Sequence, residues 1–255
     1  MKDLRMYDKP NFLLIGAARS GTTSLHGMLI QHPEIFLPKN KQPEPHYFLK
    51  TKEYEKGDDY YRSKYFDEVR DEKAIGEIST SYLFGEKVPK RIAEFNPEMN
   101  LVCILRNPSD RAYSNYWHSK KNGFENLDFI EAIKTADQRH AELNPDLQEV
   151  APYAYVGRGQ YGFQLEHYLQ HFPARQIHVI ILEEFIQNQE KYWKELLDFL
   201  NVDSSFVPNF ELINKNNSRP ENFALSNSEL EFISPYFRES NQRLFKLLDR
   251  EIEAW

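Results

Sequence analysis

The fold of this chain is decided by Phe12-Leu-Leu-Ile-Gly16-Ala-Ala-Arg19-Ser-Gly21-Thr-Thr-Ser-Leu25. The stretch begins with an apolar run of strand length, passes through a turn with two glycines, and enters a segment with helical apolar spacing. The first N–H groups of a helix have no intrahelical partner, and the helix dipole places partial positive charge at that end. The stretch therefore predicts a strand, a glycine-bounded loop and a helix N-terminus that together can hold a phosphate-like anion.

The loop differs from a nucleotide hydrolase loop in the place of its cation. Gly16 and Gly21 have the spacing of the P-loop pattern G-x-x-x-x-G-K-[ST], but Thr22 stands where the lysine would be. The positive charge lies inside the loop instead, at Arg19. We expect a phosphate-like group here with a differently placed cation, although the spacing alone also fits a strand-to-helix turn that binds nothing.

Composition and charge narrow the class of protein. The chain has 255 residues, of which 40% are hydrophobic and 28% charged, so we expect one domain over residues 1–255 with a substantial core. The net charge of −7 argues against a general nucleic-acid-binding protein, and no apolar run is long enough for a membrane span. The single cysteine, Cys103, lies in an apolar run and is interpreted as a buried thiol. A cytoplasmic location is expected, unless the chain is a piece of a longer membrane-anchored protein.

Further apolar runs predict an α/β fold. Residues 74–79, 100–106 and 176–182 read as strands, and helical patterns separate them. The expected architecture is a central parallel sheet flanked by helices, with the phosphate-binding loop after the first strand. Helices are expected over residues 87–95, 108–118, 128–143, 163–172, 188–200 and 228–252, the last broken near Pro235. Residues 144–155 are expected to form a loop, and insertions near 49–70 and 144–157 to shape an acceptor cleft.

The strand predicted over residues 100–106 ends in a permanent cation, Arg106. In nucleotide hydrolases the corresponding strand usually ends in an aspartate that helps to hold Mg²⁺. An arginine in that place suggests a second anion and no metal. The alternative is a surface or ion-paired arginine without a ligand.

A proline-rich segment, residues 32–48, carries two candidate catalytic side chains. Its prolines exclude a regular helix, so we expect an extended segment across the top of the sheet. Glu44 lies between two prolines, and His46 follows two residues later, which places both side chains on one face of an extended chain. The alternative is a solvated loop.

Four stretches together resemble the sulfotransferases that use 3′-phosphoadenosine 5′-phosphosulfate (PAPS): residues 16–23, 41–48, 105–114 and 159–169. Their order and spacing are most similar to the branch that contains the heparan sulfate N- and O-sulfotransferases and many bacterial relatives. The resemblance covers nearly the whole chain. The first and third stretches are specific when they occur together.

The resemblance implies roles for the matching residues. The 5′-phosphosulfate would be bound by the loop after the first strand, through Arg19, Ser20, Gly21, Thr22, Thr23 and Ser24. The 3′-phosphate would be bound by Arg106 and Ser114, and Glu44 would be the general base. Tyr161 would lie at the nucleotide end of the site. Ser218 and Arg219, in the polar loop 214–222, would close over the cofactor.

Two positions depart from the family pattern. The loop cation is usually lysine, and Arg19 cannot give up its proton, so it would stabilise charge without acting as an acid. Ile78 stands where some relatives carry a lysine, so the substrate contact of that lysine is not expected here.

The sequence therefore predicts sulfuryl transfer from PAPS to a hydroxyl or amine of a small molecule or glycan, with 3′-phosphoadenosine 5′-phosphate (PAP) as the second product. The chemistry needs alignment, charge stabilisation and a base, and we expect no metal. Two alternatives are a P-loop kinase or nucleotide hydrolase and a non-catalytic nucleotide-binding protein. Neither the acceptor nor the oligomeric state can be read from the sequence.

Overall fold

The computed structural model describes residues 9–38, 44–210 and 224–255. Its centre is a five-stranded sheet in the order β2-β3-β1-β4-β5, and every pair of neighbouring strands is parallel. The strands are β1 (Phe12–Gly16), β2 (Ile35–Phe36), β3 (Ala74–Ile78), β4 (Asn100–Leu105) and β5 (Ile177–Ile181). The expected α/β fold with a parallel sheet is confirmed.

Strand β1 is central and buried on both faces. Its residue Leu13 pairs with Glu77 of β3 on one side and with Leu101 of β4 on the other. Because successive side chains point to opposite faces of a strand, Leu13 and Leu14 enter two different apolar clusters. This explains why the first strand reads as a continuous apolar run.

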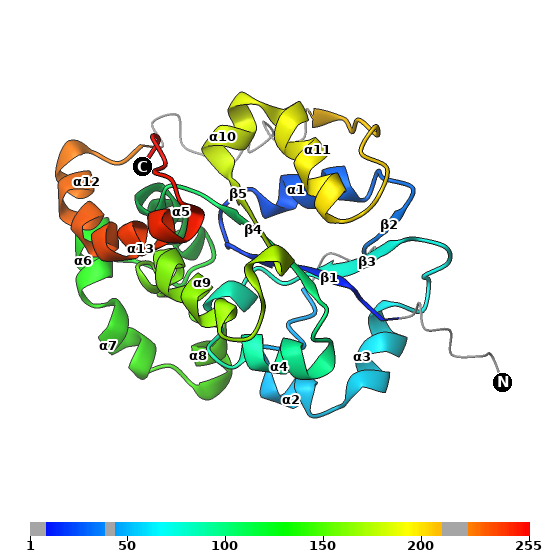
Figure 1. Ribbon diagram of the computed structural model, residues 1–255. Helices are drawn as coiled ribbons and strands as arrows, with labels where there is room; N and C mark the ends of the chain where they lie inside the picture. The colour runs from blue at the N-terminus through cyan, green and yellow to red at the C-terminus, as the bar shows by residue number, and fades with distance from the viewer. Residues whose placement is uncertain (1–8, 39–43, 211–223) are drawn as a thin grey trace.

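Helices cover both faces of the sheet (Figure 1). On one face lie α1 (Thr22–Leu29), α10 (Leu182–Gln187) and α11 (Gln189–Phe199). The other face is covered by α3 (Asp58–Tyr65), α4 (Val88–Phe95), α9 (Tyr161–Leu169) and α13 (Arg238–Leu248), with the short α2 (Thr51–Tyr54) beside them. A third apolar cluster joins α5 (Pro108–Lys121), α6 (Phe129–Lys134) and α12 (Asn227–Ile233), at the left of Figure 1.

Two predictions about residues 128–155 are wrong. The single helix expected over 128–143 is interrupted at Thr135, which separates α6 from α7 (Ala136–Ala141). The Thr135 hydroxyl donates to the Glu131 carbonyl at 2.8 Å, a local bond that competes with a continuous helix. Residues 144–155, expected to be a loop, contain α8 (Pro145–Val150). Asn144 caps this helix by accepting the Leu147 N–H at 3.0 Å, and proline is compatible with the first helical position.

Other expectations are met. The last helical segment is interrupted at Pro235, where a 3₁₀ turn, Ser234–Phe237, joins α12 to α13. Cys103 is fully buried in β4, and burial raises the pKa of its thiol to about 12, which confirms a buried thiol. Among the described residues, no helix combines the length and the apolar character needed to cross a membrane.

Candidate active site

A cavity of about 840 Å³ opens where the chain leaves β1 and β4. These strands are neighbours, but the chain runs from β1 toward one edge of the sheet and from β4 toward the other. Ligands of open α/β sheets bind in the crevice at such a reversal of strand order. Of the described residues, four cations and three carboxylates line the cavity: Arg19, Lys50, Arg106, Arg158, Glu44, Asp110 and Glu183.

The loop after β1 delivers a bare helix N-terminus to this cavity. Helix α1 begins at Thr22 after Gly21, whose φ of 91° is in the left-handed region that favours glycine. No side chain caps this end, and the first turn holds no acidic residue. Four consecutive residues line the cavity here: Gly21, Thr22, Thr23 and Ser24. Their N–H and hydroxyl groups, with the helix dipole, make a site for an anion.

Arg19 connects this loop to α5. Its Nε donates to Ser114 Oγ at 3.3 Å, and its Nη1 lies 3.5 Å from His118 Nδ1. Both partners line the cavity with it. Ser20, the next loop residue, is fully buried and is not part of the cavity wall. The loop cation therefore lies between the α1 end of the cavity and its α5 end.

The end of β4 brings Arg106 to the same cavity. The side chain is 11% exposed and forms an ion pair with Asp110, with Nη2 and Oδ2 3.6 Å apart. Asn107 fixes the start of α5, because its Oδ1 accepts the N–H groups of Ser109 at 3.0 Å and of Asp110 at 3.4 Å. Ser114 of α5 lines the cavity too, so the end of β4 and α5 together present both candidate 3′-phosphate residues.

Glu44 lies on the opposite wall, held by the end of β3. Its carboxylate accepts the Thr80 N–H at 2.9 Å and the Thr80 hydroxyl at 3.0 Å. Burial raises the pKa of Glu44, while the Thr80 hydrogen bonds and then the charge of Arg158 oppose the rise. A carboxyl group with a raised pKa is a better proton acceptor than an ordinary glutamate.

His46 lies beside Glu44, but not through the extended backbone that the sequence predicted, because its φ of 49° is in the left-handed region. Its Nε2 is 3.5 Å from Glu44 Oε2. Burial, with a smaller effect of the cations Lys50 and Arg158, lowers the pKa of His46 to about 4. The imidazole is therefore neutral near pH 7, so the contact is that of a neutral ring with a carboxylate and not an ion pair.

Tyr161 supports the site from beneath. It is fully buried and is not part of the cavity wall. Its hydroxyl donates to the Arg106 carbonyl at 3.1 Å, which steadies the end of β4. Ser218 and Arg219, which the resemblance expects to close over the cofactor, lie outside the described residues.

The structure adds residues that the sequence interpretation missed, above all Arg158. This side chain is 7% exposed and lines the cavity near Glu44. Both of its Nη atoms lie 3.2 Å from Ser81 Oγ, and burial lowers its pKa to about 10. The glycines on either side of Arg158 mark a tight turn, Gly157–Gly159, and were the available signal. His118 was also missed, although it lies one helical turn after Ser114.

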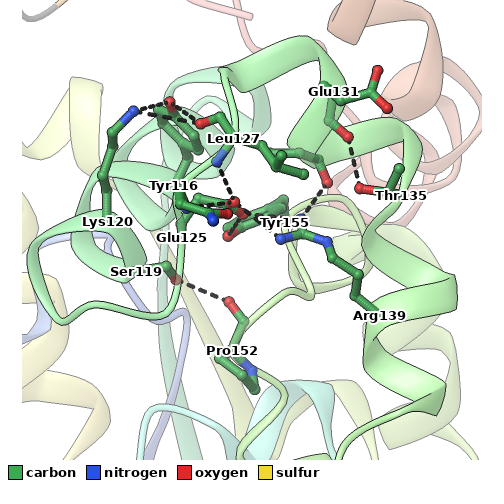
Figure 2. A network of polar contacts seen from close by, with 12 residues as sticks. Tyr116, Ser119, Lys120, Glu125, Leu127, Glu131, Thr135, Arg139, Pro152 and Tyr155 are labelled. Carbon is green, nitrogen blue, oxygen red and sulfur yellow. Dashed lines mark hydrogen bonds and ion pairs between the residues drawn. The ribbon is translucent and has the colours of Figure 1, made fainter.

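A buried network holds the wall that carries Arg158 (Figure 2). Glu125 accepts both Nη groups of Arg139, at 3.0 and 2.9 Å, and the Tyr155 hydroxyl at 2.7 Å. Ser119 of α5 donates to the Pro152 carbonyl at 3.0 Å, as Figure 2 also shows. Ala151 and Pro152 line the cavity, so this network fixes residues 151–158 against α5.

The two expected acceptor-cleft insertions contribute little surface to the cavity. Among the described residues of 49–70, only Lys50 lines it, and of 144–157 only Ala151 and Pro152 do. The aromatic side chains of the first insertion pack instead into the core under β3: Tyr54, Tyr61, Tyr65 and Phe66. Phe124 is the one aromatic ring, apart from the histidines, among the described cavity residues.

Comparisons with known proteins agree with this geometry. The family model described as sulfotransferase domain matches residues 9–243. The chain is 30% identical over 210 residues to a bifunctional heparan sulfate N-deacetylase/N-sulfotransferase of Drosophila melanogaster, covering 76% of this chain and 20% of that protein. It is 29% identical over 268 residues to bifunctional heparan sulfate N-deacetylase/N-sulfotransferase 4 of Mus musculus, covering 94% of this chain and 30% of that protein.

The chain thus spans a fifth to under a third of the length of these curated relatives. A crystal structure of a sulfotransferase from Alicyclobacillus acidocaldarius is similar over almost its whole length. It has a TM-score of 0.81 and 30% identity, covering 97% of this chain and 98% of that one. Sulfotransferases of this family use PAPS as the sulfuryl donor. The chain belongs to the sulfotransferase domain family.

Proposed function

We propose that this chain transfers the sulfuryl group of PAPS to a hydroxyl or amine of an acceptor, with Glu44 as the base. The observation that carries the proposal is that one cavity is lined by Glu44, by the bare N-terminus of α1 and by Arg106 and Ser114. A base and two anion-binding elements are what a bisphosphate donor and a protic acceptor require. Arg106 at the end of β4 and Thr22 in the loop disfavour a P-loop kinase.

The residues present fit the donor. The N–H groups at Thr22 and Thr23, with the hydroxyls of this turn, would bind the phosphate that carries the sulfuryl group. Arg106 and Ser114 would bind the 3′-phosphate. Arg19 would stabilise the negative charge that develops on the leaving phosphate, because its guanidinium is permanently charged.

The proposed transfer is a single in-line displacement. The acceptor oxygen or nitrogen forms a bond to sulfur, the bond from sulfur to the phosphate oxygen breaks, and that oxygen keeps the electron pair. Glu44 accepts the proton that the acceptor loses, and Thr80 holds its carboxylate in place. His46 is neutral, so it would contact Glu44 or the acceptor without adding charge.

We propose a glycan amine or hydroxyl as the acceptor. The two curated relatives named above are bifunctional heparan sulfate N-deacetylase/N-sulfotransferases. The wall beside Glu44 is polar: Lys50, Thr80, Ser81 and Arg158. Such groups can hydrogen-bond a sugar.

Two further proposals concern the whole chain. The match over residues 9–243 supports a single domain. The cytoplasmic location stays a prediction, to which the single buried cysteine contributes.

The test is PAP formation from PAPS with a panel of acceptors: an amino sugar, a neutral sugar and a phenol. Glu44→Gln should lower the transfer rate about 10²- to 10⁴-fold, because the base is removed, and should leave PAP binding intact. PAP binding is measured by thermal shift, where a ligand at 100 times its dissociation constant adds about 2.7 kcal/mol of stability.

Two results would contradict the proposal. Equal transfer rates in the wild type and in Glu44→Gln would remove Glu44 from the reaction. Stabilisation by PAP with no PAPS consumed for any acceptor would favour the non-catalytic nucleotide-binding protein.

A further inference from the structure

A fully buried carboxylate, Glu77 of β3, lies behind the base and has no role in the function proposed above. It accepts three hydroxyl hydrogen bonds. Tyr61 and Tyr82 donate to Oε1 at 3.0 and 2.7 Å, and Ser79 donates to Oε2 at 2.9 Å. Because each hydroxyl donates, its hydrogen points toward Glu77 and its lone pairs point away.

Two of the three hydroxyls also accept a hydrogen bond from the backbone of the segment that follows Glu44. The oxygen of Ser79 accepts the N–H of His46 at 2.9 Å. The oxygen of Tyr82 accepts the N–H of Phe48 at 3.2 Å. Each hydroxyl thus bonds Glu77 with its hydrogen and the backbone of residues 46–48 with its lone pair.

The third hydroxyl makes no such connection. Tyr61 is as deeply buried as Tyr82 and donates to the same carboxylate oxygen. Among the described residues, it bonds no backbone group of the segment 46–48. The Tyr61 ring stacks on the Tyr47 ring, with centroids 4.2 Å apart, and Tyr61→Phe keeps this contact. The chain therefore offers a matched pair of tyrosines whose hydroxyls differ in whether they bond the backbone of the segment.

The segment so held determines where Glu44 lies. Pro45 separates Glu44 from His46 and restricts the backbone between them. The carboxylate of Glu44 is bonded to Thr80, the residue after Ser79. The backbone and the side chain around the base are thus both fixed by the end of β3, and Glu77 lies at the centre of these contacts.

We propose that Glu77 is a positioning residue for Glu44, acting through the hydroxyls of Ser79 and Tyr82 on the backbone of residues 46–48. The inference rests on the proposed function, in which Glu44 is the base. A shift of about 1 Å in a catalytic group can cost about 100-fold in rate, so loosening this segment should lower kcat without changing the donor site.

The matched tyrosines give the first test. Tyr82→Phe and Ser79→Ala should each lower kcat roughly 10- to 100-fold with unchanged PAP affinity, whereas Tyr61→Phe should keep a kcat close to that of the wild type. As controls, thermal unfolding and PAP binding are measured for every variant, to establish that each variant is folded. Equal loss of kcat in Tyr61→Phe and Tyr82→Phe would overturn the proposal, because a loss of stability alone would then explain both.

Glu77→Gln, which keeps the shape of the side chain, tests whether the residues act as one unit. If Glu77 acts through Ser79, the double variant Glu77→Gln with Ser79→Ala should lose little more kcat than the stronger single variant. Losses that multiply would show two independent effects and overturn the inference.

Amide hydrogen exchange at His46 and Phe48 provides a measurement that does not depend on catalysis. Exchange at both amides should become faster in Glu77→Gln and stay unchanged in Tyr61→Phe. Unchanged exchange in Glu77→Gln would overturn the positioning role. If the wild type transfers no sulfuryl group, the proposed function fails, while the exchange measurement still decides whether Glu77 holds the segment.

Discussion

At the scale of single residues, Arg106 is open to two interpretations: it binds the 3′-phosphate, or it is an ion-paired arginine without a ligand. It both lines the cavity and pairs with Asp110. We predict that Arg106→Gln weakens PAP binding about 10- to 100-fold, since a hydrogen bond to a charged group contributes about 1.5–3 kcal/mol. Calorimetric titration with PAP measures this loss. The same titration with adenosine 5′-phosphate, which lacks the 3′-phosphate, should show little difference between variant and wild type. Arg175→Gln, a matched loss of an exposed arginine, is the control.

The pH dependence of the rate is also decided by individual residues. Burial raises the pKa of Glu44, and it raises the pKa of Glu77 to about 7, with the negative charge of Glu44 adding to the rise at Glu77. A base acts in its deprotonated form, so a raised pKa keeps it protonated, and inactive, up to a higher pH. We predict that kcat rises with pH on a limb that lies above the ordinary glutamate range.

The charge of Glu44 raises the pKa of Glu77, so Glu44 ionises first and Glu77 is still neutral while Glu44 titrates. Glu77→Gln should therefore leave this limb in place, whatever its effect on the maximal rate, and so should Glu98→Gln at an exposed position. Rate profiles measured at saturating PAPS provide the comparison. A profile with no such limb, or with its limb in the ordinary glutamate range, would refute the assignment of Glu44 as the base.

At the scale of elements, the contact between α9 and α13 depends on Gly162. A Cβ at this position would lie 2.2 Å from the Ser240 carbonyl oxygen and 2.9 Å from the Leu244 nitrogen. Alanine in a helix interior is otherwise more favourable than glycine by about 1 kcal/mol. We predict that Gly162→Ala instead destabilises the fold by about 1–3 kcal/mol, because the two backbones must separate. Urea unfolding measures the change, and a more stable variant would mean that α13 does not pack here as described.

The elements also show which parts of the fold the sequence could reveal. Strands β1 and β4 were predictable because each is a buried apolar run with a clear end. Strands β3 and β5 are short segments with several isoleucine or valine residues, which favour strands. Strand β2 has two residues at the sheet edge, too few for any periodicity. Helix α10 was missed because it begins at Leu182, directly after the last residue of β5, so no polar residue separates strand from helix.

The same limit applies to the site. Arg19, Glu44 and Arg106 could be named because each lies in a local pattern with its own chemical signal. Arg158 reaches the site by packing against Ser81, 77 residues earlier in the chain, and no local pattern predicts that contact. Glu77 likewise has its role through Tyr61, Tyr82 and Ser79, which only the fold brings together.

At the scale of the whole molecule, the two anion-binding elements belong to different strands. The loop follows β1 and Arg106 follows β4, and these strands pair in parallel, Leu13 beside Leu101. Parallel neighbours cannot be joined by a hairpin. Every strand pairing in this sheet therefore forms during folding only when a long connecting segment has brought the two strands together. In the proposed site, PAP would bind both elements only after that pairing exists.

The arrangement has a consequence for folding kinetics. A ligand that binds only the completed pairing stabilises the native state without stabilising the transition state that precedes it. We predict that PAP slows unfolding in proportion to its binding energy and leaves the refolding rate unchanged, which stopped-flow chevron plots with and without PAP would measure. Faster refolding with PAP would instead mean that β1 and β4 meet early. A bound nucleotide would thus lower the unfolding rate. The native state would then have a longer half-life than the stability of the ligand-free chain alone implies.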